Sequence, residues 1–156
     1  MNILFVCTGN TCRSPMAEAI MRHALEERGV TEVTVASAGT GAFDGSPVSE
    51  GAYLVALERG LDLSSHRARR LTEELTGNAD LILTMSAQHR DRVVDLGGEG
   101  KVFLLGVYAG RKGEEAVVND PYGASLPEYR VTFDELGRLI DPVIARLEAE
   151  RTDGQR

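Results

Sequence analysis

The sequence predicts an α/β fold in which helices cover both faces of an open, mostly parallel sheet, giving a three-layer sandwich. Short apolar runs alternate with segments of helical periodicity along the chain. These runs are continuous, which is typical of strands buried on both faces of a parallel sheet. With 156 residues, 42% of them hydrophobic, the chain can bury the core of one domain. Ligands of such sheets bind at the carboxyl ends of the strands.

In the first half of the chain, glycine and proline indicate where helices begin and end. Ser14 is the expected N-cap of the first helix, because Pro15 after it suits the first helical position. Gly29 and Gly60 each follow a helical pattern and are expected to end it. The expected elements are a strand at 3–6, a helix from 15 to 29, a strand at 33–36, a loop at 39–47 and a helix at 48–59.

The second half repeats this alternation after a polar, irregular segment. Its last helix places Phe133, Leu136, Ile140 and Leu147 at helical spacing, which is ordinary core packing. The expected elements are a short helix at 72–75, a strand at 80–84, a helix at 86–96, a strand at 101–105, a loop through 119–123 and a helix at 127–150. We therefore expect a single domain at 1–150 and a disordered tail at 151–156.

Composition and charge argue against several classes of protein. The net charge of −7 disfavours a nucleic-acid binder, although 67–70 is locally basic and could steer an anion. The apolar runs are too short to cross a bilayer, and the N-terminus lacks the pattern of a signal peptide. His23, His66 and His89 are scattered, so we expect neither a metal nor another cofactor. A cytoplasmic monomer is expected.

The residues between the first strand and the first helix carry the chemistry. Cys7 is followed by five residues and then by Arg13 and Ser14. A loop that enters a helix N-terminus presents backbone N–H groups and a favourable dipole to an anion, here from Thr8, Gly9, Asn10, Thr11, Cys12 and Arg13. The same field favours Cys7 as a nucleophilic thiolate. Arg13 can hold two phosphate oxygens, and the Ser14 hydroxyl can donate to the Cys7 sulfur.

Two competing interpretations of local motifs are weaker. Cys7 could be an inert buried cysteine beside a helix cap, but the Cys-x5-Arg-Ser spacing between a strand and a helix favours a catalytic role. Gly39-Thr40-Gly41 resembles a dinucleotide-binding motif only weakly, because it opens a long loop with Pro47 and not a helix.

Residues 6–15 resemble the signature loop of the low-molecular-weight protein tyrosine phosphatases. Within this family, the chain most resembles the protein arginine phosphatase branch. Residues 37–40, 65–69, 79–85 and 120–123 resemble further family segments, in the family's order. The resemblance implies a flavodoxin-like sheet of four parallel strands in the order 2-1-3-4. It also implies a phosphocysteine intermediate, Asp120 as general acid and base, Asn10 as a support of the loop, and His66 in a supporting network.

The resemblance leaves two substrates open. Thr11 resembles the protein arginine phosphatases, whereas tyrosine-directed members usually carry isoleucine there, so phosphoarginine in proteins is the first expectation. Phosphotyrosine is the alternative, since Phe43 lies near where tyrosine-directed members place an aromatic wall. Thr11, Phe43 and Tyr122 are therefore the expected specificity residues, phosphorylated proteins the substrates, and inorganic phosphate the product.

Other activities fit the sequence less well. Arsenate reductases share the loop but need further cysteines downstream, and no cysteine follows Cys12. A non-catalytic phosphate-binding module or a phosphocarrier does not need Arg13 and Asp120 together. We also expect Cys7 and Cys12 to form a reversible disulfide on oxidation, with simple packing of Cys12 as the alternative.

Overall fold

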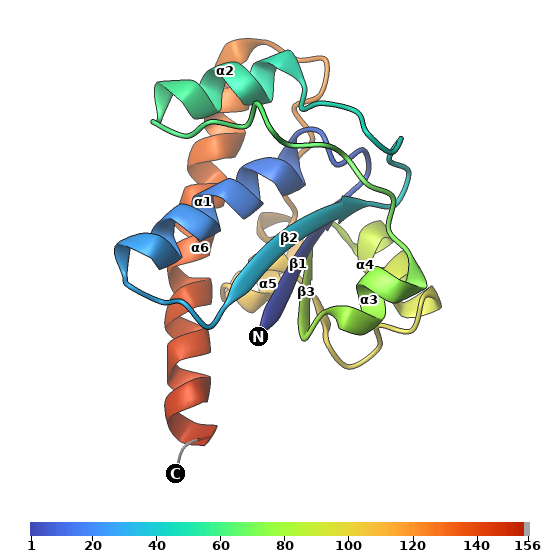
Figure 1. The fold of residues 1–156 in the computed structure, drawn as a ribbon, viewed down its shortest axis with the longest axis vertical. Coiled ribbons are helices and arrows are strands. Elements are labelled where there is room, and N and C mark those ends of the chain that lie inside the picture. The colour runs from blue at the N-terminus through green and yellow to red at the C-terminus, as the bar shows by residue number, and fades with distance from the viewer. Residues whose placement is uncertain (155–156) are drawn as a thin grey trace.

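A parallel four-stranded sheet forms the centre of the computed structural model, which describes residues 1–154 (Figure 1). Its order is β2-β1-β3-β4, which confirms the expected topology. The strand that bears the nucleophile candidate therefore lies between two others. The strands are β1 (Asn2–Cys7), β2 (Thr34–Gly39), β3 (Leu81–Thr84) and β4 (Val102–Leu104).

Helices cover both faces of this sheet, as expected. On one side α1 packs against the sheet and α6, and α2 packs on α6; α3 and α4 lie on the other side (Figure 1). No helix of residues 1–154 is long and apolar enough to span a bilayer. The helices are α1 (Arg13–Glu27), α2 (Glu50–Glu58), α3 (Glu73–Asn78), α4 (Ala87–Asp95), α5 (Leu105–Tyr108), the 3₁₀ turn η1 (Gly113–Ala116) and α6 (Leu126–Gly154).

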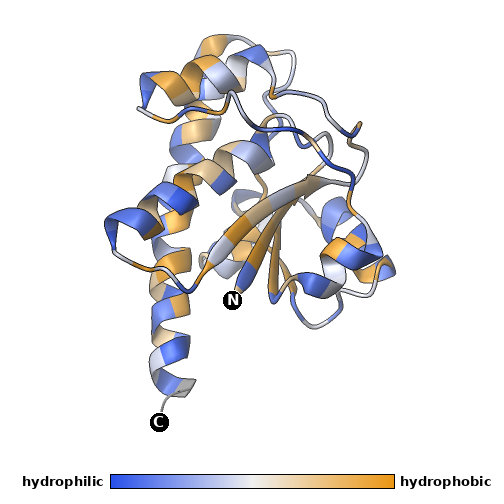
Figure 2. Cartoon of the chain, viewed as in Figure 1, coloured by the Kyte–Doolittle hydropathy of each residue, from blue (hydrophilic) through white to orange (hydrophobic). Residues whose placement is uncertain are grey.

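Alternate residues of β1 supply the two cores. Ile3 and Phe5 pack with α1 and α6, while Leu4 and Val6 pack with apolar residues of the α3 and α4 layer. All four side chains are at most 3% exposed. Figure 2 shows the strands as the most continuously apolar part of the chain. A strand buried on both faces needs an unbroken apolar run, which is why β1 could be predicted from sequence.

Three expected boundaries were wrong. The N-cap of α1 is Cys12 and not Ser14, because the Ser14 hydroxyl is hydrogen-bonded to the Cys7 sulfur. The loop expected before residue 119 contains α5 and η1, which are too short to show helical periodicity. The last helix continues past residue 150 to Gly154, so 151–154 are helical; residues 155–156 lie outside the described part.

The strand register brings three loops to one edge of the sheet. Cys7 is aligned with Gly39 of β2, and Val6 with Thr84 of β3, at the carboxyl end of each strand. Gly39 must be glycine here, because a Cβ would lie 2.4 Å from the Thr8 carbonyl oxygen. The loop after β2 can therefore lie directly against the loop after β1.

Candidate active site

The cysteine loop (residues 7–13) has the groups needed to hold an oxyanion. Its backbone N–H groups at residues 8–13 donate no hydrogen bond to any residue of the described chain. The buried Nε of Arg13 likewise has no partner within residues 1–154. Buried donors normally have acceptors, so several unpaired donors around one loop indicate a site for an anionic ligand.

The Cys7 sulfur is hydrogen-bonded to the Ser14 hydroxyl, and a neighbouring amide leaves the hydrogen of that hydroxyl available to the sulfur. Cys7 Sγ lies 2.9 Å from Ser14 Oγ, and Asn10 Nδ2 donates to the same Oγ at 2.8 Å. Because an amide nitrogen only donates, Ser14 accepts from Asn10 and keeps its own hydrogen for Cys7. A thiolate at Cys7 would accept this hydrogen bond more strongly than a thiol, since a charged acceptor makes the stronger hydrogen bond.

Asn10 holds the cysteine loop in shape. Its φ of 55° is in the left-handed region, which asparagine tolerates better than most residues. The fully buried side chain donates to Ser14 and Ser37, and its Oδ1 accepts from the Arg69 N–H at 3.0 Å. His66 Nε2 lies 2.8 Å from the Asn10 carbonyl oxygen. Asn10 thus connects the loop to two distant segments, β2 and residues 66–69.

We expect Asn10→Ala to lower the free energy of unfolding by about 3 kcal/mol, because the substitution removes the three hydrogen bonds of the Asn10 side chain and leaves the groups that made them without a partner. Ser37→Ala removes only one of these contacts and should cost about 1 kcal/mol. Urea unfolding of both variants and the wild type measures the difference. Equal losses would show that Asn10 is not the connecting residue.

Arg13 is fixed by the loop that carries Asp120. Arg13 Nη1 donates to the Val118 carbonyl oxygen at 3.1 Å, and Nη2 lies 3.5 Å from Asp120 Oδ2. The other carboxylate oxygen of Asp120 accepts from the Tyr122 N–H, so Asp120 also forms the local turn. The side chain of Asp120 is 47% exposed, whereas that of Arg13 is 7% exposed. A proton can therefore exchange between Asp120 and a bound molecule or water.

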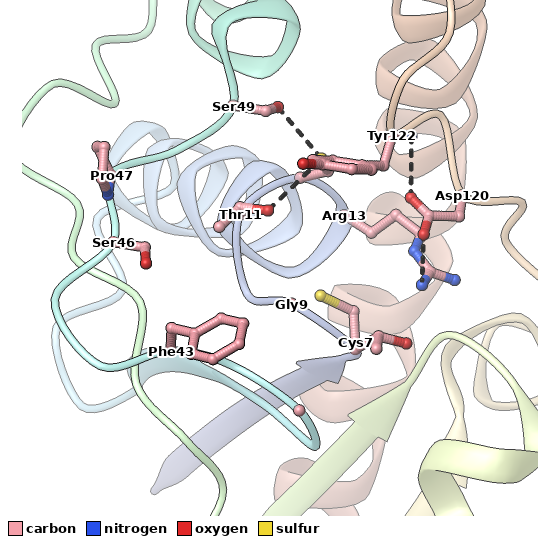
Figure 3. Close-up of a pocket in the computed structure, with 13 residues that line it drawn as sticks. Cys7, Gly9, Thr11, Arg13, Phe43, Ser46, Pro47, Ser49, Asp120 and Tyr122 are labelled. Atoms are coloured by element: carbon pink, nitrogen blue, oxygen red, sulfur yellow. Dashed lines mark hydrogen bonds and ion pairs between the residues drawn. The ribbon is translucent and has the colours of Figure 1, made fainter.

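Most of the predicted site residues meet in one pocket of about 440 Å³ (Figure 3). Phe43 and Tyr122 reach it from separate loops and are 82% and 70% exposed. Thr11 lines the wall. Of the predicted residues, Asn10, Ser14 and His66 do not line the pocket and instead contact the loop from behind. The full lining is Cys7, Thr8, Gly9, Thr11, Cys12, Arg13, Gly41, Phe43, Ser46, Pro47, Ser49, Asp120 and Tyr122.

The Cys12 thiol belongs to a polar cluster that the sequence did not reveal. Cys12 Sγ lies 3.1 Å from Ser49 Oγ and 3.5 Å from Tyr129 Oη. Tyr129 donates to Ser49 Oγ at 3.1 Å, and burial raises the pKa of Tyr129 to about 12. Cys7 and Cys12 are both free thiols here, so their disulfide remains a prediction.

His89 also lies at the site, although it was not among the predicted site residues. Its Nε2 is 2.8 Å from Thr8 Oγ1 and its Nδ1 is 3.1 Å from Ser86 Oγ. Burial and the positive charge of Arg13 lower the pKa of His89 to about 4, against the opposing effect of Asp120. The ring is therefore neutral near pH 7. No group of three or more candidate metal ligands occurs within residues 1–154.

Several proteins similar to this chain are named as phosphatases. The family model described as low molecular weight phosphotyrosine protein phosphatase matches residues 2–153. A protein-arginine-phosphatase of Bacillus subtilis is 40% identical over 153 residues, covering 97% of this chain and 99% of that protein. The low molecular weight protein-tyrosine-phosphatase Wzb of Escherichia coli K12 is 38% identical over 152 residues, covering 96% and 97%.

A solved structure extends the similarity to three dimensions. It is the YwlE arginine phosphatase in a mutant form with a phosphorylated active-site serine. It is 38% identical to this chain, with a TM-score of 0.88 and coverage of 97% of this chain and 99% of that one. The family model, the sequence relatives and the fold agree over nearly the whole chain. This chain belongs to the low molecular weight phosphotyrosine protein phosphatase family.

Proposed function

We propose that this phosphatase acts on phosphoarginine in proteins, through a phosphocysteine intermediate on Cys7. The observation that carries the substrate assignment is Thr11, which lines the same pocket as Cys7 and whose hydroxyl lies 3.8 Å from the Cys12 sulfur. A hydroxyl can hydrogen-bond to a guanidinium, which an aliphatic side chain cannot do. Similarity to proteins named protein-arginine-phosphatase supports the same choice.

The reaction proposed for this site has two displacements. The Cys7 thiolate attacks phosphorus, the P–N bond breaks, and the Asp120 carboxyl gives its proton to the departing guanidine nitrogen. Arg13 and the N–H groups of the cysteine loop bind the equatorial oxygens. Water then attacks the phosphocysteine, its proton passes to Asp120, and the P–S bond breaks to release phosphate and the thiolate. The proton that Asp120 lends in the first step is thus recovered in the second.

The rim of the pocket suits a guanidinium. Phe43 and Tyr122 present aromatic faces on which a planar cation can stack, and the Asp120 carboxyl lies beside them as a hydrogen-bond partner. Ser46 and Ser49 add hydroxyls to the lining. Phosphotyrosine remains the second candidate, because the same two aromatic side chains could hold a phenyl ring.

The test compares phosphoarginine and phosphotyrosine peptides in the wild type and in Thr11→Ile. We expect the wild type to prefer phosphoarginine, and Thr11→Ile to lower kcat/KM for it by about 10- to 100-fold, through the loss of a half-buried hydrogen-bond partner. Phosphotyrosine turnover should rise. Thr11→Val is the matched control, since it removes the hydroxyl without adding length. If the wild type ignored phosphoarginine, or if Thr11→Ile left the preference unchanged, the assignment would be wrong.

The expectations of a single domain, a monomer, a cytoplasmic location, and no nucleic-acid or membrane partner stay predictions. The net charge of −7 supports the lack of affinity for nucleic acid. Phosphorylated protein substrates and a phosphate product follow from family membership.

A further inference from the structure

His89 does not line the pocket but contacts Thr8, which does. It lies in α4, on the opposite face of the sheet from α1, and is 4% exposed. Its Nε2 is 2.8 Å from the hydroxyl of Thr8, the residue that follows the nucleophile and lines the pocket. A buried ring that reaches the loop next to Cys7 is well placed to act on it.

Ser86 holds this ring instead of capping its own helix. Ser86 occupies the N-cap position of α4 with an extended backbone, yet its side chain makes no capping hydrogen bond. Its Oγ instead lies 3.1 Å from His89 Nδ1. Serine at an N-cap normally accepts from the first turn of the helix, and that contact stabilises the helix. The N-terminus of α4 thus lacks a capping hydrogen bond, and the Ser86 hydroxyl orients the His89 ring instead.

A neutral His89 ring can make both hydrogen bonds of the series Ser86, His89 and Thr8. Neutral imidazole has one donor and one acceptor nitrogen, and each hydroxyl can either donate or accept. Both ring nitrogens are therefore satisfied by the two hydroxyls. The low pKa of His89, caused by burial and by Arg13, keeps the ring in this form. Arg13 then supplies the positive charge beside Cys7.

We propose that His89 is a positioning residue that fixes the first peptide of the cysteine loop by holding the hydroxyl of Thr8. This peptide is also held from the other side, because the Thr40 N–H donates to the Cys7 carbonyl oxygen at 2.9 Å, and the Gly41 N–H donates to the Thr8 carbonyl oxygen of the next peptide at 2.9 Å. Asn10 fixes the middle of the loop, but its side chain contacts neither Thr8 nor Gly9. His89 therefore supports the part of the loop that Asn10 leaves unsupported.

Fixing this peptide matters because the loop N–H groups must converge on the phosphoryl oxygens before the reaction. Donors that are already oriented stabilise the developing charge without reorganising. The inference rests on the proposed phosphate-binding role of the cysteine loop. It does not depend on the choice between phosphoarginine and phosphotyrosine.

Two substitutions of His89 separate positioning from packing. Glutamine places its terminal amide near the position of Nε2 and can still reach Thr8, whereas asparagine mimics Nδ1 and reaches only Ser86. We expect His89→Asn to lower kcat/KM for p-nitrophenyl phosphate about tenfold and to raise the inhibition constant of inorganic phosphate by a similar factor. We expect His89→Gln to stay within about threefold of the wild type. Thermal unfolding of each variant monitors the fold.

Thr8→Val completes the test, because it removes the hydroxyl while keeping the shape of the side chain. It should match His89→Asn in kcat/KM, and the double variant should be no worse than either single one. Additive losses, an equal loss in His89→Gln, or full activity in Thr8→Val would overturn the inference. If the His89 variants did not fold, Thr8→Val alone would decide. A fully active Cys7→Ser would instead refute the proposed site itself.

Discussion

Cys7→Ser is expected to reduce turnover of p-nitrophenyl phosphate by at least about a thousandfold, since removal of a nucleophile leaves only the binding contributions to catalysis. A hydroxyl in the same place is far less ionised than a thiol and is a poorer leaving group in the second step. The fold should persist, because Cys7 is one side chain of a core with many other apolar members. Initial rates without added metal measure the loss.

The proposed phosphocysteine intermediate provides a second measurement of the role of Cys7. Wild-type enzyme quenched in acid during turnover should carry one phosphoryl group on the peptide that contains Cys7, as seen by mass spectrometry. Inorganic phosphate should still protect Cys7→Ser against thermal unfolding, because Arg13 and the loop N–H groups remain. Turnover that survives the substitution would refute the phosphocysteine mechanism.

Asp120→Asn should have an effect that depends on the leaving group. An amide cannot give up a proton, so substrates with basic leaving atoms should lose about 10² to 10⁴ in kcat/KM. Phosphoarginine and alkyl or phenyl phosphates belong to this class, whereas p-nitrophenolate departs without a proton and should lose far less. A plot of log kcat/KM against the pKa of the leaving group should therefore be steeper for Asp120→Asn than for the wild type.

The control for Asp120→Asn is phosphate binding, which depends on Arg13. The carboxylate pairs with the Arg13 guanidinium at 3.5 Å, so its replacement could also disturb phosphate binding. Asparagine keeps the Oδ1 that accepts from the Tyr122 N–H, which preserves the turn. The inhibition constant of inorganic phosphate should consequently change little. A uniform loss for all leaving groups would indicate disturbed binding and would contradict the role of Asp120 as a general acid.

The parts of the site that sequence could predict are those encoded within one short stretch. Cys7, Arg13 and Ser14 are neighbours along the chain, and the strand and helix around them follow from local hydrophobic patterns. Asp120 was accessible only through the resemblance to a family, because nothing local distinguishes it from a turn-forming aspartate. In the structure, one of its carboxylate oxygens accepts from the Tyr122 N–H in the turn, and the other pairs with Arg13.

Contacts between distant segments were not predictable in the same way. Ser49 and Tyr129 meet Cys12 because α2 and α6 approach closely, and Gly51 permits this by leaving room for the Tyr129 ring. His89 had a usable signal that was missed: it follows the strand expected at 80–84, and β3 is the neighbour of β1. Polar residues after adjacent parallel strands gather at one edge of the sheet.

The central place of β1 determines when during synthesis this enzyme becomes active. The strand that ends in Cys7 is translated first, yet it pairs with β2 and β3, and Arg13 is held by the carbonyl of Val118. A ribosome-bound chain that stops short of these residues has the reactive thiol but lacks the neighbours that shape its surroundings. Premature termination anywhere before Asp120 therefore yields a fragment that contains Cys7 and Arg13 but lacks the carboxylate that pairs with Arg13.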